Sequence, residues 1–222
     1  MVGTPPAGPP ADRTIEVAPE RLPGWLGRFS AAHGQPEARP EGADLVLAFP
    51  DGSAVRLVDR WGGAAPADPA GWIAAQGRDR RVGLLLVRRT AHAVGIATGP
   101  ALDAHHVDTH YVQGRTKAGG WSQQRYARRR SNQTDQALRS AADDAARVLL
   151  PDAATLDGLV CGGDAREVAR VLADPRLRAL AERRTLHPVY PVPDPRLVVL
   201  RDLAVTLRAV PVQITDPPPA PQ

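Results

Sequence analysis

Three short strand-like segments followed by one long amphipathic segment constrain the fold of this chain most strongly. Residues 82–87, 91–96 and 105–112 have the pattern of strands and are joined by short links, which favours an antiparallel meander. A helix is expected over residues 122–149, because small and apolar residues recur along one helical face, and Pro151 ends it. The expected buried face consists of Ala127, Thr134, Leu138, Ala141, Ala145 and Val148.

The segments after Pro151 alternate between strand and helix. A short buried strand is expected over residues 156–161, and Asp164 is a suitable N-cap for a helix that reaches residue 173. The pairs Asp174-Pro175 and Asp194-Pro195 repeat this cap-then-proline pattern. The last helix is expected to bury Leu197, Leu200 and Val205, and a closing strand is expected over residues 210–214. The predicted fold class is α/β, an α+β arrangement in which helices pack on a sheet that mixes antiparallel and parallel pairs.

The first third of the chain predicts a small N-terminal subdomain over residues 13–78, consisting of a helix and a hairpin. Residues 19–33 have helical spacing of apolar side chains, with Gly34 as the stop. Two strands, 44–49 and 54–61, flank a turn sequence, and a short helix is expected over 70–76. The Pro-rich ends, residues 1–12 and 215–222, are expected to be disordered tails.

Composition excludes several classes of protein. Cys161 is the only cysteine, so the chain cannot form an internal disulfide. The N-terminus lacks the basic and apolar regions of a signal peptide, and no apolar run approaches the roughly 20 residues of a membrane helix. We therefore expect a cytoplasmic protein that does not enter a membrane.

Positive charge is concentrated in one interval. No acidic residue occurs between Asp108 and Asp135, although the interval carries six cationic side chains and the whole chain has a net charge of only +4. These cations are Arg115, Lys117, Arg125, Arg128, Arg129 and Arg130. A glycine-bearing loop beside local positive charge is typical of contact with a phosphate backbone. Gly119 and Gly120 would let that loop approach a ligand closely.

Residues 119–130, Gly-Gly-Trp-Ser-Gln-Gln-Arg-Tyr-Ala-Arg-Arg-Arg, resemble the central domain of eukaryotic and archaeal peptide-chain release factors. In that domain a Gly-Gly-Gln loop runs into a helix that begins Ser-x-x-Arg-Phe-Ala-Arg, and Trp121 stands where those proteins keep the glutamine. The Vms-type branch carries Gly-x-x-Gln instead, which Gly120-Trp121-Ser122-Gln123 matches. The chain thus resembles a bacterial, actinobacterial Vms-like release factor, a peptidyl-tRNA hydrolase.

This resemblance implies a ribonuclease H-like catalytic domain over residues 79–214 that releases nascent chains from tRNA on stalled large ribosomal subunits. Gln123 would position the attacking water or the terminal ribose hydroxyl, and Gly119 and Gly120 would allow entry into the peptidyl-transferase centre. The six cations of the basic interval would contact rRNA and the tRNA acceptor end, and Trp121 would stack on a base or pack the loop. The implied protein is a monomer that needs no metal or organic cofactor.

Other interpretations stay open at this point. Gln123 and its neighbour Gln124 also fit ordinary polar positions at a helix start, and the arginines fit a solvated helix face. The chain could be a non-catalytic ribosome- or rRNA-binding module of the same fold. A third possibility is a metal-dependent hydrolase, because His106, Asp108 and His110 would share one face of a strand and all are metal-ligand types. Alternation on a solvated sheet face explains that trio equally well.

Overall fold

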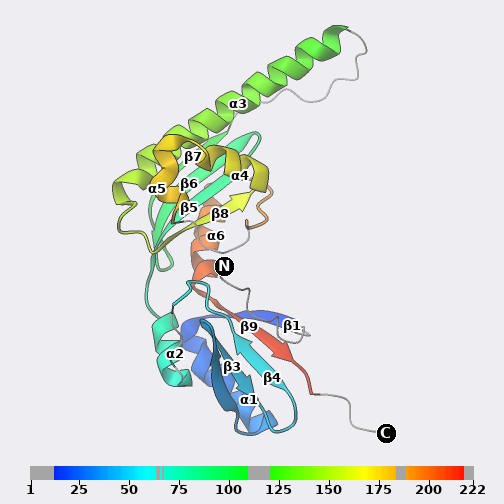
Figure 1. Ribbon diagram of the computed structural model, residues 1–222, viewed down its shortest axis with the longest axis vertical. Coiled ribbons are helices and arrows are strands. Elements are labelled where there is room, and N and C mark those ends of the chain that lie inside the picture. Colours follow the sequence, from blue (N-terminus) through cyan, green and yellow to red (C-terminus); the bar gives the residue numbers. More distant parts are fainter. Residues whose placement is uncertain (1–12, 64–65, 67, 110–120, 184–188, 218–222) are drawn as a thin grey trace. The chain divides into compact units, whose positions relative to one another are not determined.

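A computed structural model describes residues 13–63, 66, 68–109, 121–183 and 189–217, with the backbone alone for residues 121–127, 129 and 130. The chain forms two compact units, shown in Figure 1. Unit 1 comprises Met1–Asp79 and Thr206–Gln222, and unit 2 comprises Arg80–Val205. Within the described part of the chain, no helix is both long enough and apolar enough to cross a membrane.

Unit 1 is built on a five-stranded antiparallel sheet with the strand order β1-β9-β4-β3-β2. Its strands are β1 (Arg13–Val17), β2 (Glu37–Glu41), β3 (Asp44–Ala48), β4 (Ala54–Leu57) and β9 (Val210–Thr215). Its helices are η1 (Pro19–Arg21), α1 (Leu22–His33) and α2 (Pro69–Gln76). The predicted helix, hairpin and short helix are all present, and α1 ends where Gly34 adopts a φ of 93°.

The core of unit 1 joins strand residues to the two helices. Leu45, Leu57 and Val212 from the sheet are fully buried together with Leu22 of α1. Trp72 of α2 is also buried, and its indole N–H donates to the carbonyl of Ala43 over 3.0 Å, which satisfies its one polar group.

Three strands of unit 1 differ from the sequence prediction. Strand β9 was expected to close the domain that spans residues 79–214, but it pairs with β1 and β4 of unit 1. Its alternating burial, with Val210, Val212 and Ile214 inward, predicts a strand without specifying the partner sheet. Strands β1 and β2 were not predicted. For β2 the reason is that it is an edge strand of exposed and half-buried residues that includes Pro40.

Unit 2 contains a four-stranded mixed sheet with the order β7-β6-β5-β8. Strands β5 (Arg81–Arg88), β6 (Ala91–Thr98) and β7 (Ala101–Thr109) form the predicted antiparallel meander, and β8 (Gly158–Gly163) pairs parallel to β5. The helices are α3 (Trp121–Leu149), η2 (Leu150–Asp152), α4 (Ala165–Leu172), η3 (Pro175–Leu177), α5 (Arg178–Ala181) and α6 (Leu197–Arg208), the last of which continues into unit 1. The mixed α/β architecture predicted from the sequence is therefore confirmed.

Helix α3 packs on the sheet mainly through alanines. Of the predicted buried face, Thr134, Leu138, Ala141 and Ala145 are buried and Val148 is partly buried against the same core. The small side chains let the helix backbone approach β6 closely. The side chain of Ala127 lies outside the described residues.

The caps after β8 follow the predicted pattern, whereas the last helix differs. Asp164 accepts hydrogen bonds from the N–H groups of Arg166 and Glu167, and Asp174 caps η3 in the same way. Helix α6 begins only at Leu197, and Val205, which was expected to be buried, is 58% exposed. The buried stripe is instead formed by Leu200, Leu203, Ala204 and Leu207, a spacing of three and four residues that follows one helix face.

Strand β7 also begins earlier than predicted, at Ala101, because Gly99 with a φ of 55° reverses the chain directly after β6. Residues 110–112, expected at its end, lie outside the described residues, as do residues 1–12 and 218–222 of the predicted tails. Thr215, expected in the second tail, is the last residue of β9.

Candidate functional site

The predicted glycine-glutamine segment connects β7 to α3. Strand β7 ends at Thr109 and α3 begins at Trp121, one residue before the predicted start. Gly119 and Gly120 lie between these elements and outside the described residues, and so do Arg115 and Lys117. Trp121 and Gln123 belong to the first turn of α3. The backbone of Arg125, Arg129 and Arg130 lies in the following turns of the same helix.

Gln123 therefore sits at a helix N-terminus. The first N–H groups of any α-helix lack acceptors within the helix, and the helix dipole adds partial positive charge at that end. No acidic side chain occurs in the first turn of α3 to neutralise this charge. The position is thus chemically suited to an anion or to an oxygen that gains negative charge during a reaction.

The two halves of α3 have different environments. At about 1.5 Å per residue, its 29 residues make a rod roughly 43 Å long. Among the described side chains, Thr134 is the first buried one, and Arg128, Ser131 and Asn132 before it are exposed. Figure 1 shows the N-terminal turns of α3 extending beyond the sheet of unit 2. The second half thus anchors the helix, and the first half carries Gln123 away from the core.

Charges along α3 follow the same division. In the second half, acidic residues are paired with basic residues: Asp135 with Arg170 at 2.6 Å and Asp143 with Arg176 at 2.8 Å. The first half contains no acidic residue and includes Arg128, whose side chain is exposed. Arg128 therefore adds exposed positive charge to a part of the helix whose sequence contains no acidic residue.

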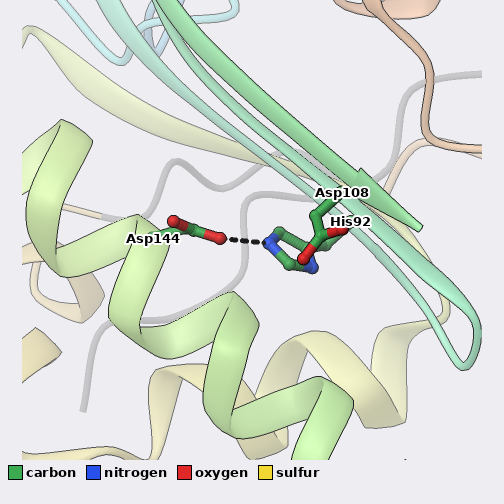
Figure 2. A group of neighbouring side chains, drawn as sticks. All are labelled: His92, Asp108 and Asp144. Atoms are coloured by element: carbon green, nitrogen blue, oxygen red, sulfur yellow. Dashed lines mark hydrogen bonds and ion pairs between the residues drawn. The ribbon is translucent and has the colours of Figure 1, made fainter. Parts of the chain in front are cut away.

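A second group of polar residues lies where the anchored half of α3 crosses the sheet, shown in Figure 2. His92 of β6, Asp108 of β7 and Asp144 of α3 each offer a metal-ligating atom, and these atoms lie within 4.8 Å of one another. His92 and Asp108 are direct cross-strand neighbours. His92 Nε2 lies 2.8 Å from Asp144 Oδ2, and Nε2 of His106 lies 3.3 Å from the same oxygen.

Asp144 is held as a carboxylate. Burial favours its neutral form, but hydrogen bonds from Arg147, at 2.5 Å, and from His92 outweigh that effect, and the charge of His106 adds to them. Together they hold the pKa of Asp144 below its ordinary value.

This group only partly matches the trio expected from the sequence. His106 and Asp108 lie on a strand as predicted, while His110 lies outside the described residues. The pattern along one strand missed His92 and Asp144, which come from two other elements. One signal for them was present: each is a polar residue at a position that the apolar pattern of its own element would bury.

A known family matches unit 2 and the beginning of the C-terminal segment of unit 1. Residues 80–213, more than half of the 222-residue chain, match the family described as Actinobacteria/chloroflexi VLRF1 release factor. Peptide chain release factor subunit 1 from Thermococcus onnurineus and from Pyrococcus abyssi are each 32% identical over 83 residues. The match covers 36% of this chain and 20% of each relative, so the chain spans about a fifth of the length of these curated relatives.

Two solved structures are similar in backbone arrangement. One, described as an archaeal protein, has a TM-score of 0.43 and 15% identity over 73% of this chain and 52% of its own. The other, the archaeal translation termination factor aRF1, has a TM-score of 0.43 and 11% identity over 88% of this chain and 66% of its own.

Proposed function

The chain belongs to the Actinobacteria/chloroflexi VLRF1 release factor family, and we propose that it is a peptidyl-tRNA hydrolase that releases nascent chains from stalled large ribosomal subunits. The observation that carries this proposal is the position of Trp121-Ser122-Gln123, the segment that directly follows Gly120 in the sequence. It enters the first turn of a long helix whose far half is anchored in the core and whose near half carries only positive charge. A helix arranged in this way can reach into an RNA-lined site while its domain stays outside.

Hydrolysis of the peptidyl-tRNA ester requires few catalytic groups from the protein. The ester between peptide and tRNA is already activated, so positioning a water molecule and stabilising the developing oxyanion are sufficient to accelerate hydrolysis. Gln123 supplies a side-chain amide that orients the water or the terminal ribose hydroxyl, and first-turn N–H groups face the oxyanion. Gly119 and Gly120 allow the close approach, and Trp121 stacks on a base or packs the loop.

The basic residues are proposed to bind the protein to RNA. Arg115, Lys117, Arg125, Arg128, Arg129 and Arg130 contact rRNA and the tRNA acceptor end, where each cation releases counterions from phosphate. The large ribosomal subunit with its peptidyl-tRNA is therefore the proposed partner. The proposed role is rescue of stalled subunits and not ordinary termination, because Gly120-Trp121-Ser122-Gln123 matches the Vms-type pattern and departs from the Gly-Gly-Gln loop of conventional release factors.

A non-catalytic ribosome-binding module is the alternative, favoured by the fact that an arginine-rich helix suffices for RNA contact without any reaction. The two functions separate in one experiment. Large subunits carrying labelled peptidyl-tRNA are mixed with the wild-type chain, and released peptide and bound protein are both measured. Release that exceeds the spontaneous rate supports the hydrolase, whereas salt-sensitive binding without release supports the module.

A further inference from the structure

We propose that His92, Asp108 and Asp144, with His106 beside them, form a binding site for one divalent transition metal ion of the zinc class, which links α3 to the sheet of unit 2. This site goes beyond the proposed release activity. It uses two residues, His92 and Asp144, that the strand pattern in the sequence did not single out.

The geometry brings the donors together from three elements. His92 comes from β6, His106 and Asp108 from β7, and Asp144 from α3. Two imidazole nitrogens converge on one carboxylate oxygen of Asp144, at 2.8 Å and 3.3 Å. A tetrahedral zinc ion with bonds of about 2.0–2.1 Å places its ligand atoms about 3.3 Å apart. The ligand atoms of His92, Asp108 and Asp144 lie within 4.8 Å of one another, so side-chain rotations that close this spacing admit the ion, which takes the place of the hydrogen bond between His92 and Asp144 (Figure 2).

The environment of these side chains suits a bound metal ion. His92 is 1% exposed and the side chain of Asp144 is 13% exposed, so both are withdrawn from competing water. One imidazole and two carboxylates lie within 4.8 Å of one another, so the charges of these three ligands balance a divalent cation. Arg147 holds the other oxygen of Asp144 at 2.5 Å, which orients the carboxylate as outer partners of metal ligands commonly do. The mixed nitrogen and oxygen donors suit zinc and disfavour magnesium, which prefers oxygen alone.

The role of this metal is structural. Asp144 lies 21 positions after Gln123 on the same helix, which corresponds to roughly 32 Å at 1.5 Å per residue. That distance excludes direct participation of the ion in a reaction at Gln123. An ion bound by three elements would instead stabilise the docking of the anchored half of α3, because binding to the folded state alone shifts the unfolding equilibrium.

The test uses the full chain, stripped of metal with EDTA and titrated with zinc in the presence of a competing chelator. We expect one zinc ion per chain and a higher unfolding temperature with zinc, with no comparable effect of magnesium. Cobalt bound at the same stoichiometry should give the intense visible absorption of tetrahedral coordination. Asp144→Asn and Asp108→Asn should each weaken zinc binding at least about tenfold.

The matched control is His105→Ala, which removes an exposed histidine from β7 next to the site. It should bind zinc as the wild type does. Asp108→Asn preserves the shape of a half-exposed strand residue, and a wild-type circular dichroism spectrum will establish that it folds. The proposal is wrong if the wild type fails to bind zinc stoichiometrically, or if both carboxylate variants bind it with unchanged affinity.

Discussion

Replacing Arg128 with alanine should weaken binding to large ribosomal subunits and make the remaining binding less sensitive to salt. Arg128 is exposed on the first half of α3, within the interval that contains no acidic residue. Each phosphate contact contributes about 0.7–0.9 to the slope of log K against log salt concentration. Between about 50 and 200 mM salt, loss of one contact therefore removes about half a logarithmic unit of salt-induced weakening. The affinity ratio of wild type to variant should thus shrink about threefold over that range.

Arg139→Ala provides the matched control for Arg128→Ala. Arg139 is exposed on the same helix, 11 residues later and therefore close to three full turns away on the same face. It lies between Asp135 and Asp143, outside the acid-free interval. Binding of both variants to purified subunits is measured over a salt series. If Arg128→Ala leaves the slope unchanged, or if Arg139→Ala lowers it equally, the first half of α3 is not the docking surface.

Two further predictions concern the units themselves. Gly163→Ala should lower the free energy of unfolding of unit 2 by about 3–4 kcal/mol, because φ is 101° and a Cβ would meet Val87 O at 2.1 Å, which breaks hydrogen bonds that join β8 to its neighbours. Hydrogen exchange of the β5 and β8 amides measures this loss, and protection equal to the wild type would contradict the prediction. In Gly42→Ala, with a φ of 65° and open space, only the strain of about 1–2 kcal/mol is expected. Hydrogen bonds from Ser53 and His33 lower the pKa of Asp51 to about 2. The contribution of Asp51 to the stability of unit 1 is therefore complete above the ordinary carboxyl pKa of about 4 and is lost as pH falls towards 2. Urea unfolding of unit 1 in Asp51→Asn should lack this acid dependence, and an unaltered dependence would refute the assignment.

Most elements of unit 2 could be predicted from the sequence, because short stretches of the chain determine them. The meander over β5 to β7 has short links, and the caps at Asp164 and Asp174 act on the N–H groups that directly follow them. Helix α3 was predictable from the spacing of its small and apolar residues. In each case the residues that determine the element lie within the element itself.

Long-range pairing was not predictable in the same way. The alternation in β9 specifies a strand, but its pairing with β1 depends on residues almost 200 positions away. The same limit applies to the candidate metal site. A single strand pointed to His106 and Asp108, whereas His92 and Asp144 join them only after β6 and α3 have packed together.

The candidate catalytic segment depended on its residue motif more than on its fold. Helical spacing placed Gln123 near a helix start, and the structure has it in the first turn of α3. The spacing alone could not separate a functional glutamine from an ordinary polar residue at a helix end. Only the order Gly120-Trp121-Ser122-Gln123, followed by the arginines, pointed to release chemistry.

Peptide release by Gln123→Ala and Gln124→Ala, compared side by side, tests the central claim most directly. Successive residues of a helix point about 100° apart, so the two glutamines cannot face the ester in the same way. On large subunits carrying peptidyl-tRNA, we predict that Gln123→Ala lowers the release rate by about 100-fold or more while its binding is unchanged. Gln124→Ala should release peptide at nearly the wild-type rate. Wild-type release by Gln123→Ala would contradict the proposal.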